Sequence, residues 1–504
     1  MTSRVLSAAL QGVDGVPVEV EVRISSQLPR IDVVGLPEAA VRESSARVRA
    51  AVTALGQEFP NRRITVNLAP AELRKSGAGL DLPIAVAVLA ASGAVEAASL
   101  DGLSLIGELA LDGRLRPVRG ALAMAMALRD AGCRQLVVPT GNAGEAALTP
   151  GLRVYGAADL GTVVRHLHDA PPLAAETPRM PDAPPPAPDL SEVRGQERAK
   201  RALEIAAAGG HGLLLRGAPG AGKTMLARRL PGFLPPMRFD EALEVTKIHG
   251  VLGVQSGPLR TERPFRAPHH TASPAGLLGG GSPPHPGEVS LAHGGVLFLD
   301  ELPEFDRRCL EALRQVLEER RIAIARARIS CVFPADFQLV AAANPCPCGW
   351  RHSGQRDCRC DDGSVARYTA RISGPLLDRI DLQVTVHPVP WRTLSRSGAC
   401  GSSSADLRAR VVEARRRQRQ RDGCANARLA DGRLEAGVQA TPEAMRLLGR
   451  AVDSFGLSAR GARRVLRVAR TIADLGGETR TGPEAMAEAL SFRQESDPTP
   501  SPGI

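Results

Sequence analysis

Residues 213–224 read Leu-Leu-Leu-Arg-Gly-Ala-Pro-Gly-Ala-Gly-Lys-Thr, an apolar strand followed at once by the pattern GxxxxGK[ST]. The glycines of such a loop let its backbone N–H groups point at a triphosphate, and its lysine reaches the β- and γ-phosphates. A helix is expected over 225–230, so its positive end faces the same anion. The predicted nucleotide site consists of Gly217, Ala218, Pro219, Gly220, Ala221, Gly222, Lys223 and Thr224, with the Thr224 hydroxyl on Mg²⁺.

Residues 295–301, Gly-Val-Leu-Phe-Leu-Asp-Glu, form a second apolar strand that ends in two acids. A doubly wound α/β sheet binds its ligands at the ends of its strands. We therefore predict that Asp300 holds Mg²⁺, directly or through a water, and that Glu301 polarises the water that attacks the γ-phosphate. The two motifs together predict an α/β protein that hydrolyses a nucleoside triphosphate.

The composition limits the other possibilities. With 504 residues, the chain is long enough for about three domains. No apolar run reaches the roughly 18 residues of a membrane-spanning helix, and the N-terminus lacks the pattern of a signal peptide. Four of the nine cysteines fall within 346–360, which suggests a local site in a reducing compartment. We expect a cytoplasmic protein with no membrane partner.

The chain is basic, with a formal net charge of +10, and lysine occurs at only four positions. This charge permits binding of nucleic acid but does not establish it. Residues 415–421 read Arg-Arg-Arg-Gln-Arg-Gln-Arg at the end of a helix-like stretch that begins near Ala405. Contact with nucleic acid and a solvated helix face explain this run equally well.

Changes in composition divide the chain into blocks. Strand-like and helix-like segments alternate in the first block, and a proline-dense stretch after it is typical of an extended linker. The predicted parts are an α/β domain (1–168), a linker (169–188), a nucleotide-binding core (189–390), a helical lid (391–492) and a disordered tail (493–504). In the first domain the predicted strands are 18–24, 63–68, 103–109 and 134–138, and the predicted helices are 39–55 and 82–89.

The core resembles the AAA+ ATPases beyond its two nucleotide motifs. Residues 193–196, Val-Arg-Gly-Gln, precede a helix before the phosphate loop, where AAA+ proteins contact adenine, and this implies that Gln196 contacts ATP. Residues 338–343 form a strand that ends in Asn344, which looks like the sensor-1 residue that orients the attacking water. The resemblance adds an adenine contact and a catalytic residue to the site.

Two arginines extend this resemblance. Residues 374–381, Gly-Pro-Leu-Leu-Asp-Arg-Ile-Asp, resemble a segment of magnesium chelatase ATPase subunits and replicative helicases, which implies that Arg379 is an arginine finger for a neighbouring subunit. Residues 457–461, Leu-Ser-Ala-Arg-Gly, resemble the sensor-2 motif, which implies that Arg460 touches the phosphates of its own subunit. The implied fold is a P-loop AAA+ core with a helical lid.

Over nearly its whole length the chain is similar to the YifB/ComM family of bacterial magnesium chelatase-like AAA+ proteins. The family implies a ring-shaped hexamer that uses ATP and Mg²⁺. ComM members are branch-migration helicases that extend homologous pairing during natural transformation, which implies DNA as a partner. The similarity is carried by 266–273 (Arg-Ala-Pro-His-His-Thr-Ala-Ser), 276–281, 286–293, 344–349 (Asn-Pro-Cys-Pro-Cys-Gly) and 463–475.

The first domain resembles the α/β domain shared by Lon-type proteases and RadA. A Lon protease needs a serine nucleophile and a lysine that activates it. Gly79 takes the serine position, and no lysine occurs between Lys75 and Lys200, so we expect no peptidase activity. RadA uses this scaffold to support DNA binding, which implies a DNA-contacting role for residues 1–168. The matching segments are 66–70, 81–85, 107–109 and 113–118.

Cys346-x-Cys348 and Cys358-x-Cys360 form a set of four cysteines. Four thiolates can bind Zn²⁺ tetrahedrally, although C-x-C is tighter than the common C-x₂-C spacing. A redox or purely structural thiol cluster is the alternative. The set lies on a polar, glycine-containing loop that leaves the strand ending at Asn344.

Four histidines precede the second strand motif, in segments rich in glycine and proline. They are irregularly spaced, and no carboxylate completes a metal triad with them. Contact with phosphates or bases in a central pore, or a structural role, explains them better than a metal. They are His269, His270, His285 and His293.

Three functions compete. The leading hypothesis is an ATP-driven DNA translocase or branch-migration helicase that acts in homologous recombination or natural transformation. A magnesium chelatase-type subunit shares the core, but this chain lacks the acidic, proline-containing linker and the integrin-like domain. A protein-remodelling AAA+ ATPase is the third hypothesis.

Overall fold

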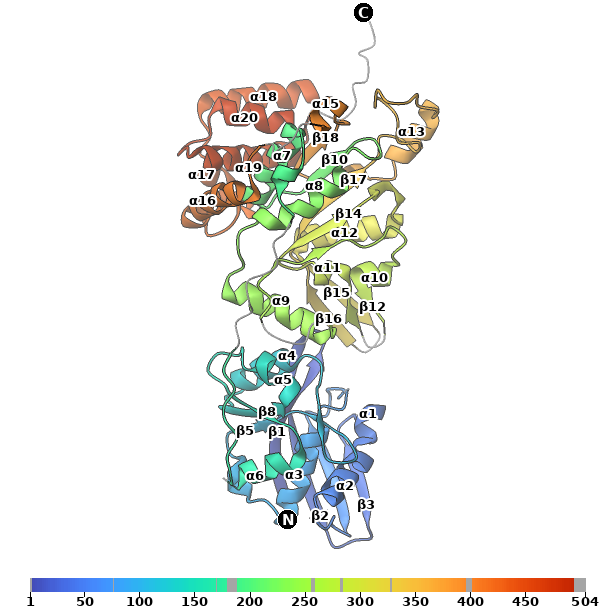
Figure 1. The fold of residues 1–504 in the computed structure, drawn as a ribbon, viewed down its shortest axis with the longest axis vertical. Helices are drawn as coiled ribbons and strands as arrows, with labels where there is room; N and C mark the ends of the chain where they lie inside the picture. Colours follow the sequence, from blue (N-terminus) through green and yellow to red (C-terminus); the bar gives the residue numbers. More distant parts are fainter. Residues whose placement is uncertain are drawn as a thin grey trace, which may run out of the picture.

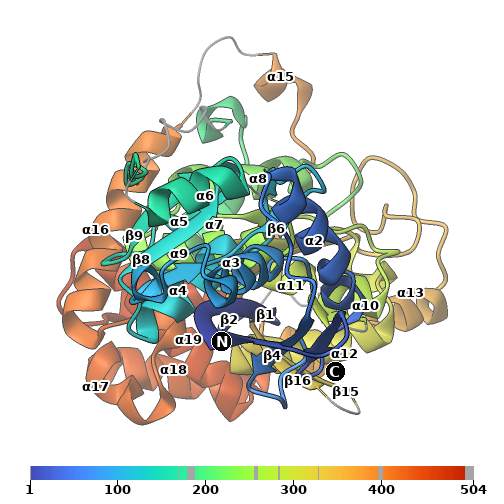
Figure 2. The ribbon, with the colours of Figure 1, turned by 90° about the horizontal axis from the view of Figure 1, so that it is seen from below.

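The computed structural model describes residues 2–75, 77–168, 170–178, 188–254, 259–281, 284–326, 329–395 and 401–493. An N-terminal α/β domain and the predicted nucleotide-binding core follow one another along the long axis, and the helical lid lies beside the core (Figure 1). Seen along that axis (Figure 2), the lid helices α16 to α18 lie on one side of the core and α13 lies on the other. The core therefore contacts other parts of the chain both below and beside it.

A seven-stranded mixed sheet, in the order β3-β4-β2-β1-β5-β8-β9, forms the N-terminal domain. Its central strand β1 (Thr2–Gln11) pairs antiparallel with β2 (Asp14–Ser25) and parallel with β5 (Leu103–Leu105). The sequence pattern does not predict β1, because its alanines and polar residues give a weak strand signal. The other strands are β3 (Arg30–Val34), β4 (Arg63–Ala69), β8 (Gln135–Pro139), β9 (Arg153–Ala157) and a hairpin of β6 (Glu108–Leu109) and β7 (Leu115–Arg116).

Two predicted elements of this domain are divided in the structure. The predicted helix 39–55 forms α1 (Ala39–Arg42) and α2 (Ser44–Ala54), and the Ser44 hydroxyl donates to the Val41 carbonyl at 2.6 Å near the break. The predicted strand 103–109 forms β5 and β6. The remaining helices are α3 (Asp81–Ser92), α4 (Ala121–Asp130), α5 (Thr140–Ala146) and α6 (Leu160–Leu167).

Five parallel strands, in the order β11-β14-β17-β10-β18, form the core sheet. β17 (Gln338–Ala343) lies between β10 (Leu213–Arg216) and β14 (Val296–Leu299), and β18 (Leu382–Thr385) flanks β10. The segments after β10, β17 and β14 therefore meet at one edge of the sheet. The other strands are β11 (Phe265–Arg266), β12 (Gly279–Gly280), β13 (His285–Pro286), β15 (Arg321–Arg326) and β16 (Ile329–Pro334).

One hydrophobic cluster joins the core to the lid, because Leu203, Val411 and Val468 from three different helices pack within it. The core helices are α7 (Glu197–Gly209), α8 (Lys223–Arg229), α9 (Phe239–Val251), α10 (Pro274–Leu278), α11 (Glu288–Leu291), α12 (Arg307–Glu319), α13 (Asp362–Thr369), α14 (Gly374–Leu377) and α15 (Trp391–Leu394). The lid helices are α16 (Ser404–Asp422), α17 (Leu434–Val438), α18 (Pro442–Phe455), α19 (Ala459–Gly476) and α20 (Pro483–Ser491).

The turn between β1 and β2 attaches the N-terminal domain to the core. Val13 is buried in a cluster with Ile248 of α9 and Phe333 of β16. Beside it, Lys247 of α9 forms an ion pair with Asp14 at 2.8 Å. The helix α9 and the hairpin β15–β16 are therefore in direct contact with the N-terminal domain (Figure 1).

Part of the predicted linker 169–188 belongs to the N-terminal domain. The Glu176 N–H donates to the Val154 carbonyl at 2.8 Å, and Ala175 forms a β-bridge with Tyr155. This segment therefore extends the sheet beside β9. Residues 169 and 179–187 of the predicted linker and 494–504 of the predicted tail lie outside the described residues. No helix in the described part of the chain has both the length and the apolar character needed to cross a bilayer.

Candidate nucleotide-binding and hydrolysis site

The phosphate loop joins β10 to α8, and its glycines are required by its geometry. A Cβ atom on Gly217 would lie 2.3 Å from the Val386 carbonyl oxygen, and Gly222 has a φ of +96°. α8 begins at Lys223, directly after Gly222, so the unpaired N–H groups of its first turn lie at the loop. This arrangement is suited to binding an anion.

Lys223 lies inside the curl of this loop. Its Nζ atom donates to the carbonyl oxygens of Gly217 at 2.6 Å and Ala218 at 3.0 Å, and to Asn344 Oδ1 at 3.0 Å. Burial lowers the pKa of Lys223, while the charges of Asp300 and Glu301 oppose that shift. The structure therefore brings Lys223 and Asn344 together, although they are far apart in the sequence.

The end of β14 supplies the carboxylates. Thr224 Oγ1 donates to Asp300 Oδ2 at 2.7 Å, so the two proposed Mg²⁺ ligands are adjacent. Oxygen atoms of this kind are the ligands that Mg²⁺ prefers. Glu301 follows in the left-handed conformation, with a φ of 52°, and its side chain is 50% exposed. After this turn, the Glu301 side chain lines the same cavity as Asp300.

One cavity of about 390 Å³ brings together Lys223, Thr224, Asp300, Glu301 and Asn344. Gln196 lies just outside it, and its Nε2 atom donates to the carbonyl oxygens of Ala221 at 3.2 Å and His387 at 2.6 Å. Gln196 therefore lies beside the phosphate loop, and its contact with adenine stays a prediction. The cavity is lined by Pro219, Gly220, Ala221, Gly222, Lys223, Thr224, Met225, Asp300, Glu301, Ala343 and Asn344.

His270 is a site residue whose role the sequence analysis missed. Its Nδ1 atom lies 3.1 Å from Glu301 Oε2, and its ring lies against that of His269 at a centroid distance of 4.1 Å, with the two planes tilted by 33°. The two histidines follow β11, which pairs with β14. That strand pairing, which the sequence pattern does not reveal, brings His270 to the predicted catalytic carboxylate.

Arg379 lies at the opposite edge of the sheet from the phosphate loop of its own chain. It precedes β18, whereas the loop follows the parallel neighbour β10. Its side chain is 4% exposed, forms an ion pair with Glu318 and donates to the Pro375 carbonyl at 2.6 Å. An arginine in this place cannot contact nucleotide bound by its own chain.

Arg460 lies at the same edge as Arg379, which corrects the implied contact with the phosphates of its own subunit. Arg464, one turn further along α19, donates to the Arg379 carbonyl at 2.8 Å and pairs with Asp381 at 2.6 Å. Burial lowers the pKa of Arg379, and the nearby charge of Arg460 adds to this shift. The lid packs with the start of α19 away from the phosphate loop, a placement that the motif alone did not determine.

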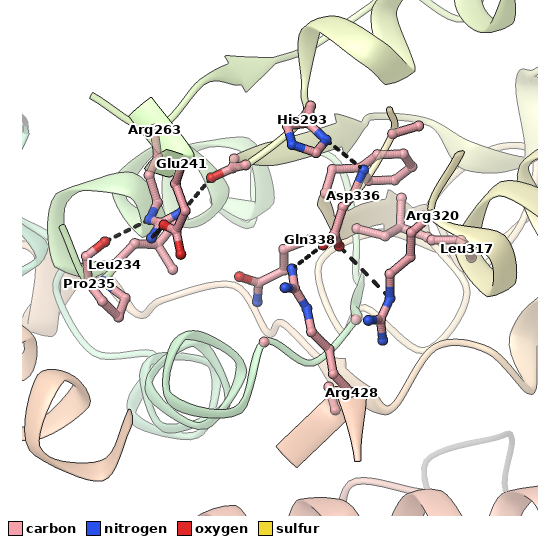
Figure 3. A pocket seen from close by; sticks show the side chains of 18 of the residues that line it. Leu234, Pro235, Glu241, Arg263, His293, Leu317, Arg320, Asp336, Gln338 and Arg428 are labelled. Carbon is pink, nitrogen blue, oxygen red and sulfur yellow. Dashed lines mark hydrogen bonds and ion pairs between the residues drawn. The ribbon is translucent and has the colours of Figure 1, made fainter. Parts of the chain in front are cut away.

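A second cavity, also of about 390 Å³, lies between the core and the lid, beside the residues that precede β10, β14 and β17 (Figure 3). Glu241 pairs with Arg263 at 2.9 Å and with Arg419 of the lid at 3.3 Å. Asp336 pairs with Arg428 of the lid at 2.7 Å. Charged groups here connect the lid to the core, away from the predicted chemistry.

The arginine run 415–421 is part of this connection. It lies on α16, and four of its five arginines bind groups elsewhere in the chain, so neither a solvated face nor a free nucleic-acid surface describes it. Arg415 donates to the Ala207 carbonyl, Arg417 to the Asp474 carbonyl, Arg419 to Glu241 and Arg421 to the Asp474 carboxylate.

The four cysteines of the predicted metal set lie together on the loop after β17. The Sγ atom of Cys346 is 3.4 Å from that of Cys348 and 3.7 Å from that of Cys358. All four Sγ atoms, including that of Cys360, lie within 4.8 Å of one another. The structure therefore forms a cluster of thiols that could bind a metal.

Three family models match consecutive parts of the chain. A model described as magnesium chelatase, subunit ChlI, matches residues 189–394. A model described as subunit ChlI of Mg-chelatase matches residues 20–142, and one for the C-terminal part of that subunit matches residues 401–493. The matches fall in the N-terminal domain, the core and the lid.

Several relatives are similar over nearly the full length. An uncharacterised protein of Mycobacterium tuberculosis is 46% identical over 498 residues, which is 97% of this chain and 98% of the relative. The protein YifB of Escherichia coli is 45% identical over 494 residues, 97% of each chain. Competence protein ComM of Haemophilus influenzae is 44% identical over 495 residues, again 97% of each chain.

Proposed function

Because the chain belongs to the YifB/ComM family, we propose that it is an AAA+ ATPase that works on DNA as a translocase or branch-migration helicase. The observation that carries the proposal is the convergence of Lys223, Asp300 and Asn344 on one cavity, from the ends of three parallel strands. Such an arrangement can bind a triphosphate and position water against it. ATP and Mg²⁺ are the cofactors we propose for this site, and Zn²⁺ for the cysteine cluster.

Five residues of the cavity have roles in the proposed hydrolysis. Bound Mg²⁺, held by Thr224 and Asp300, would neutralise charge on the phosphate oxygens. Lys223 binds the β- and γ-phosphates through its ammonium group. Asn344 orients the attacking water, and Glu301 accepts the proton that this water loses. Hydrolysis therefore depends on groups that different strands bring together.

The two arginines at the opposite edge of the sheet support a ring. Arg379 and Arg460 can contact a nucleotide only if a neighbouring subunit presents its phosphate loop to that edge. We therefore assign both to the nucleotide of the neighbour, in a hexamer of the kind that the family implies. Arg379 must then exchange its partner Glu318 for the γ-phosphate.

We take DNA as the partner, and homologous recombination or natural transformation as the setting. One relative bears the name competence protein ComM, which favours this setting. We also place the protein in the cytoplasm, where thiols stay reduced. The second candidate is a magnesium chelatase-type or protein-remodelling ATPase, which the descriptions of the matching family models favour.

The rate of ATP hydrolysis with and without DNA tests the proposal. We expect single-stranded, duplex or four-way-junction DNA to stimulate hydrolysis severalfold, and the protein to move the branch point of a labelled junction in the presence of ATP. The Glu301→Gln variant is the control for contaminating ATPases. Hydrolysis that no DNA stimulates would contradict the DNA function and favour the second candidate.

A further inference from the structure

The cysteine cluster has the dimensions of a tetrahedral metal site. With metal–sulfur bonds of about 2.3 Å, the sulfur atoms around Zn²⁺ lie about 3.8 Å apart. The Sγ distances of 3.4 Å between Cys346 and Cys348, and of 3.7 Å from each of them to Cys358, are close to that value. A disulfide would need about 2.05 Å. The four side chains are therefore arranged around a common centre.

The ligand type selects the class of metal. Four thiolates favour Zn²⁺ or iron over Mg²⁺ or Ca²⁺, which prefer oxygen. Four protein ligands close the coordination sphere, as in structural zinc sites rather than catalytic ones, which leave a position open for water. The chemistry of the cluster thus points to a structural Zn²⁺ ion.

The loop that carries the cluster touches the phosphate loop. Gly349 follows Cys348 directly and has a φ of +82°. A Cβ atom on Gly349 would lie 2.6 Å from Pro219 Cδ and 2.7 Å from Pro219 Cγ. The Gly349 N–H also donates to the Cys346 carbonyl at 2.9 Å. The backbone beside two metal ligands is thus packed against the segment that wraps the triphosphate.

The same loop begins at the sensor strand. Cys346 is two residues after Asn344, whose Oδ1 atom accepts a hydrogen bond from Lys223 at 3.0 Å. One end of the cysteine loop is therefore attached to a residue that contacts the lysine of the phosphate loop, and its next turn contacts Pro219 of that loop. A change in the position of the cluster would move both contacts.

Between the two cysteine pairs, the loop has side-chain contacts at the surface. Arg351 pairs with Asp362 at 2.9 Å, but the Asp362 side chain is 93% exposed. The Arg356 guanidinium lies 4.7 Å from the centre of the Trp350 ring. Exposed contacts of these kinds are weak. A metal ion that joins residues 346, 348, 358 and 360 would hold the loop far more firmly.

We propose that Cys346, Cys348, Cys358 and Cys360 bind one Zn²⁺ ion, and that this ion holds Gly349 against Pro219 and so maintains the nucleotide-binding shape of the phosphate loop. The proposal rests on the ATP site assigned above. Zinc occupancy would then control the affinity of the protein for ATP, although the ion lies outside the ATP cavity.

The test combines metal analysis with nucleotide binding. The full-length protein, purified under reducing conditions, is expected to hold one zinc ion per chain. The Cys358→Ser/Cys360→Ser variant should lose this zinc and bind a fluorescent ATP analogue at least tenfold more weakly. Cys424→Ser, a substitution in the lid, is the matched control and should change neither value. Circular dichroism and gel filtration confirm that each variant is folded.

Two further measurements separate the ion from the side chains. Removing zinc from the wild type with a chelator should weaken binding of the analogue, and added Zn²⁺ should restore it in the wild type but not in the double variant. Gly349→Ala should keep its zinc yet bind the analogue more weakly, because the added methyl group meets Pro219.

The outcomes distinguish this proposal from the proposed function. Stoichiometric iron, no metal in the wild type, or unchanged affinity in zinc-free protein would each overturn the zinc proposal, while DNA-stimulated hydrolysis could still stand. A zinc-loaded wild type that binds no ATP analogue would overturn the ATP site itself.

Discussion

Lys223 and Glu301 occupy the same cavity but contact different partners. Lys223 is buried and bound to the phosphate loop and Asn344, whereas Glu301 is half-exposed and faces His270. Removing the Lys223 side chain should therefore weaken binding of the phosphates. Neutralising Glu301 should impair only the activation of the attacking water. The two roles can be separated by single substitutions.

Glu301→Gln is expected to bind ATP with nearly wild-type affinity and to lose at least about 99% of turnover, because the lysine and Mg²⁺ ligands remain while the base is lost. Lys223→Ala should weaken ATP binding itself. Equilibrium binding of an ATP analogue and steady-state phosphate release measure the two effects. Near-normal turnover by Glu301→Gln would contradict the assigned roles.

A buried acid at the domain junction should make stability depend on pH. Glu145 of α5 is 4% exposed, and its Oε1 atom would lie 2.6 Å from a Cβ atom on Gly250 of α9. Burial raises the pKa of Glu145 from 4.5 to about 7, although the Leu122 N–H opposes the shift. The folded state thus favours the protonated form of Glu145. The contribution of Glu145 to the free energy of unfolding is therefore fully present below pH 4.5 and is lost as the pH rises to about 7.

Glu145→Gln should therefore become more stable than the wild type as the pH rises. The shift predicts a relative gain of roughly 2 kcal/mol between pH 5 and pH 8, or several degrees in Tm. Calorimetry of both proteins at the two pH values measures it, with the exposed Glu58→Gln as control. A difference in Tm that does not change with pH would show that Glu145 is not held protonated.

At the scale of elements, arginines rather than apolar contacts alone connect the lid to the core. Arg419 of α16 pairs with Glu241. Arg428, in the segment after α16, pairs with Asp336 (Figure 3). Buried apolar residues of α7, α16 and α19 also pack together and hold the lid against the core. The position of Arg460 at the far edge follows from this packing.

Asp336→Asn is expected to destabilise the lid by about 1–2 kcal/mol, because it leaves Arg428 without its carboxylate partner in a group of like charges. The loss should be larger in 0.05 M than in 0.5 M salt, since salt screens the remaining repulsion. Thermal unfolding at both salt concentrations measures it. Asp240→Asn, whose side chain is 67% exposed, is the matched control and should have little effect.

At the scale of the whole molecule, the residues that we propose for ATP hydrolysis are divided between two edges of one sheet. The phosphate loop and Glu301 are at one edge, and Arg379 and Arg460 are at the other. A ring in which every subunit presents both edges would complete six sites at once. A single subunit should then hydrolyse ATP slowly, because its site lacks the arginines of a neighbour.

Arg379→Ala should bind ATP but hydrolyse it about 10³-fold more slowly, because the γ-phosphate of the neighbour loses its arginine. Mixing this variant with Glu301→Gln should restore part of the activity, since some interfaces then combine an intact Arg379 with an intact Glu301. Phosphate release at several mixing ratios measures the effect. Full activity of a monomeric wild type at low concentration would contradict the shared site.

The sequence was sufficient for the parts of the site that lie within a few residues of one another. The phosphate loop with α8, the pair of Asp300 and Glu301, and the two C-x-C pairs depend on local backbone geometry, which short motifs specify. Long apolar runs likewise indicated the buried parallel strands, because both of their faces are covered. Family resemblance supplied Asn344 and Gln196, and the structure places both beside the loop.

Only the tertiary structure decided which distant elements meet. The pairing of β11 with β14 brings His270 to Glu301, and the docking of the lid moves Arg460 away from the phosphates of its own chain. Contacts with other elements also give most of the arginines of the α16 run their partners. Contacts of the same kind place β1 at the centre of its sheet, although its own residues give only a weak strand signal. Strand order and helix docking depend on contacts between residues that are far apart in the sequence. A local pattern of residues therefore does not reveal which strands pair or where a helix packs.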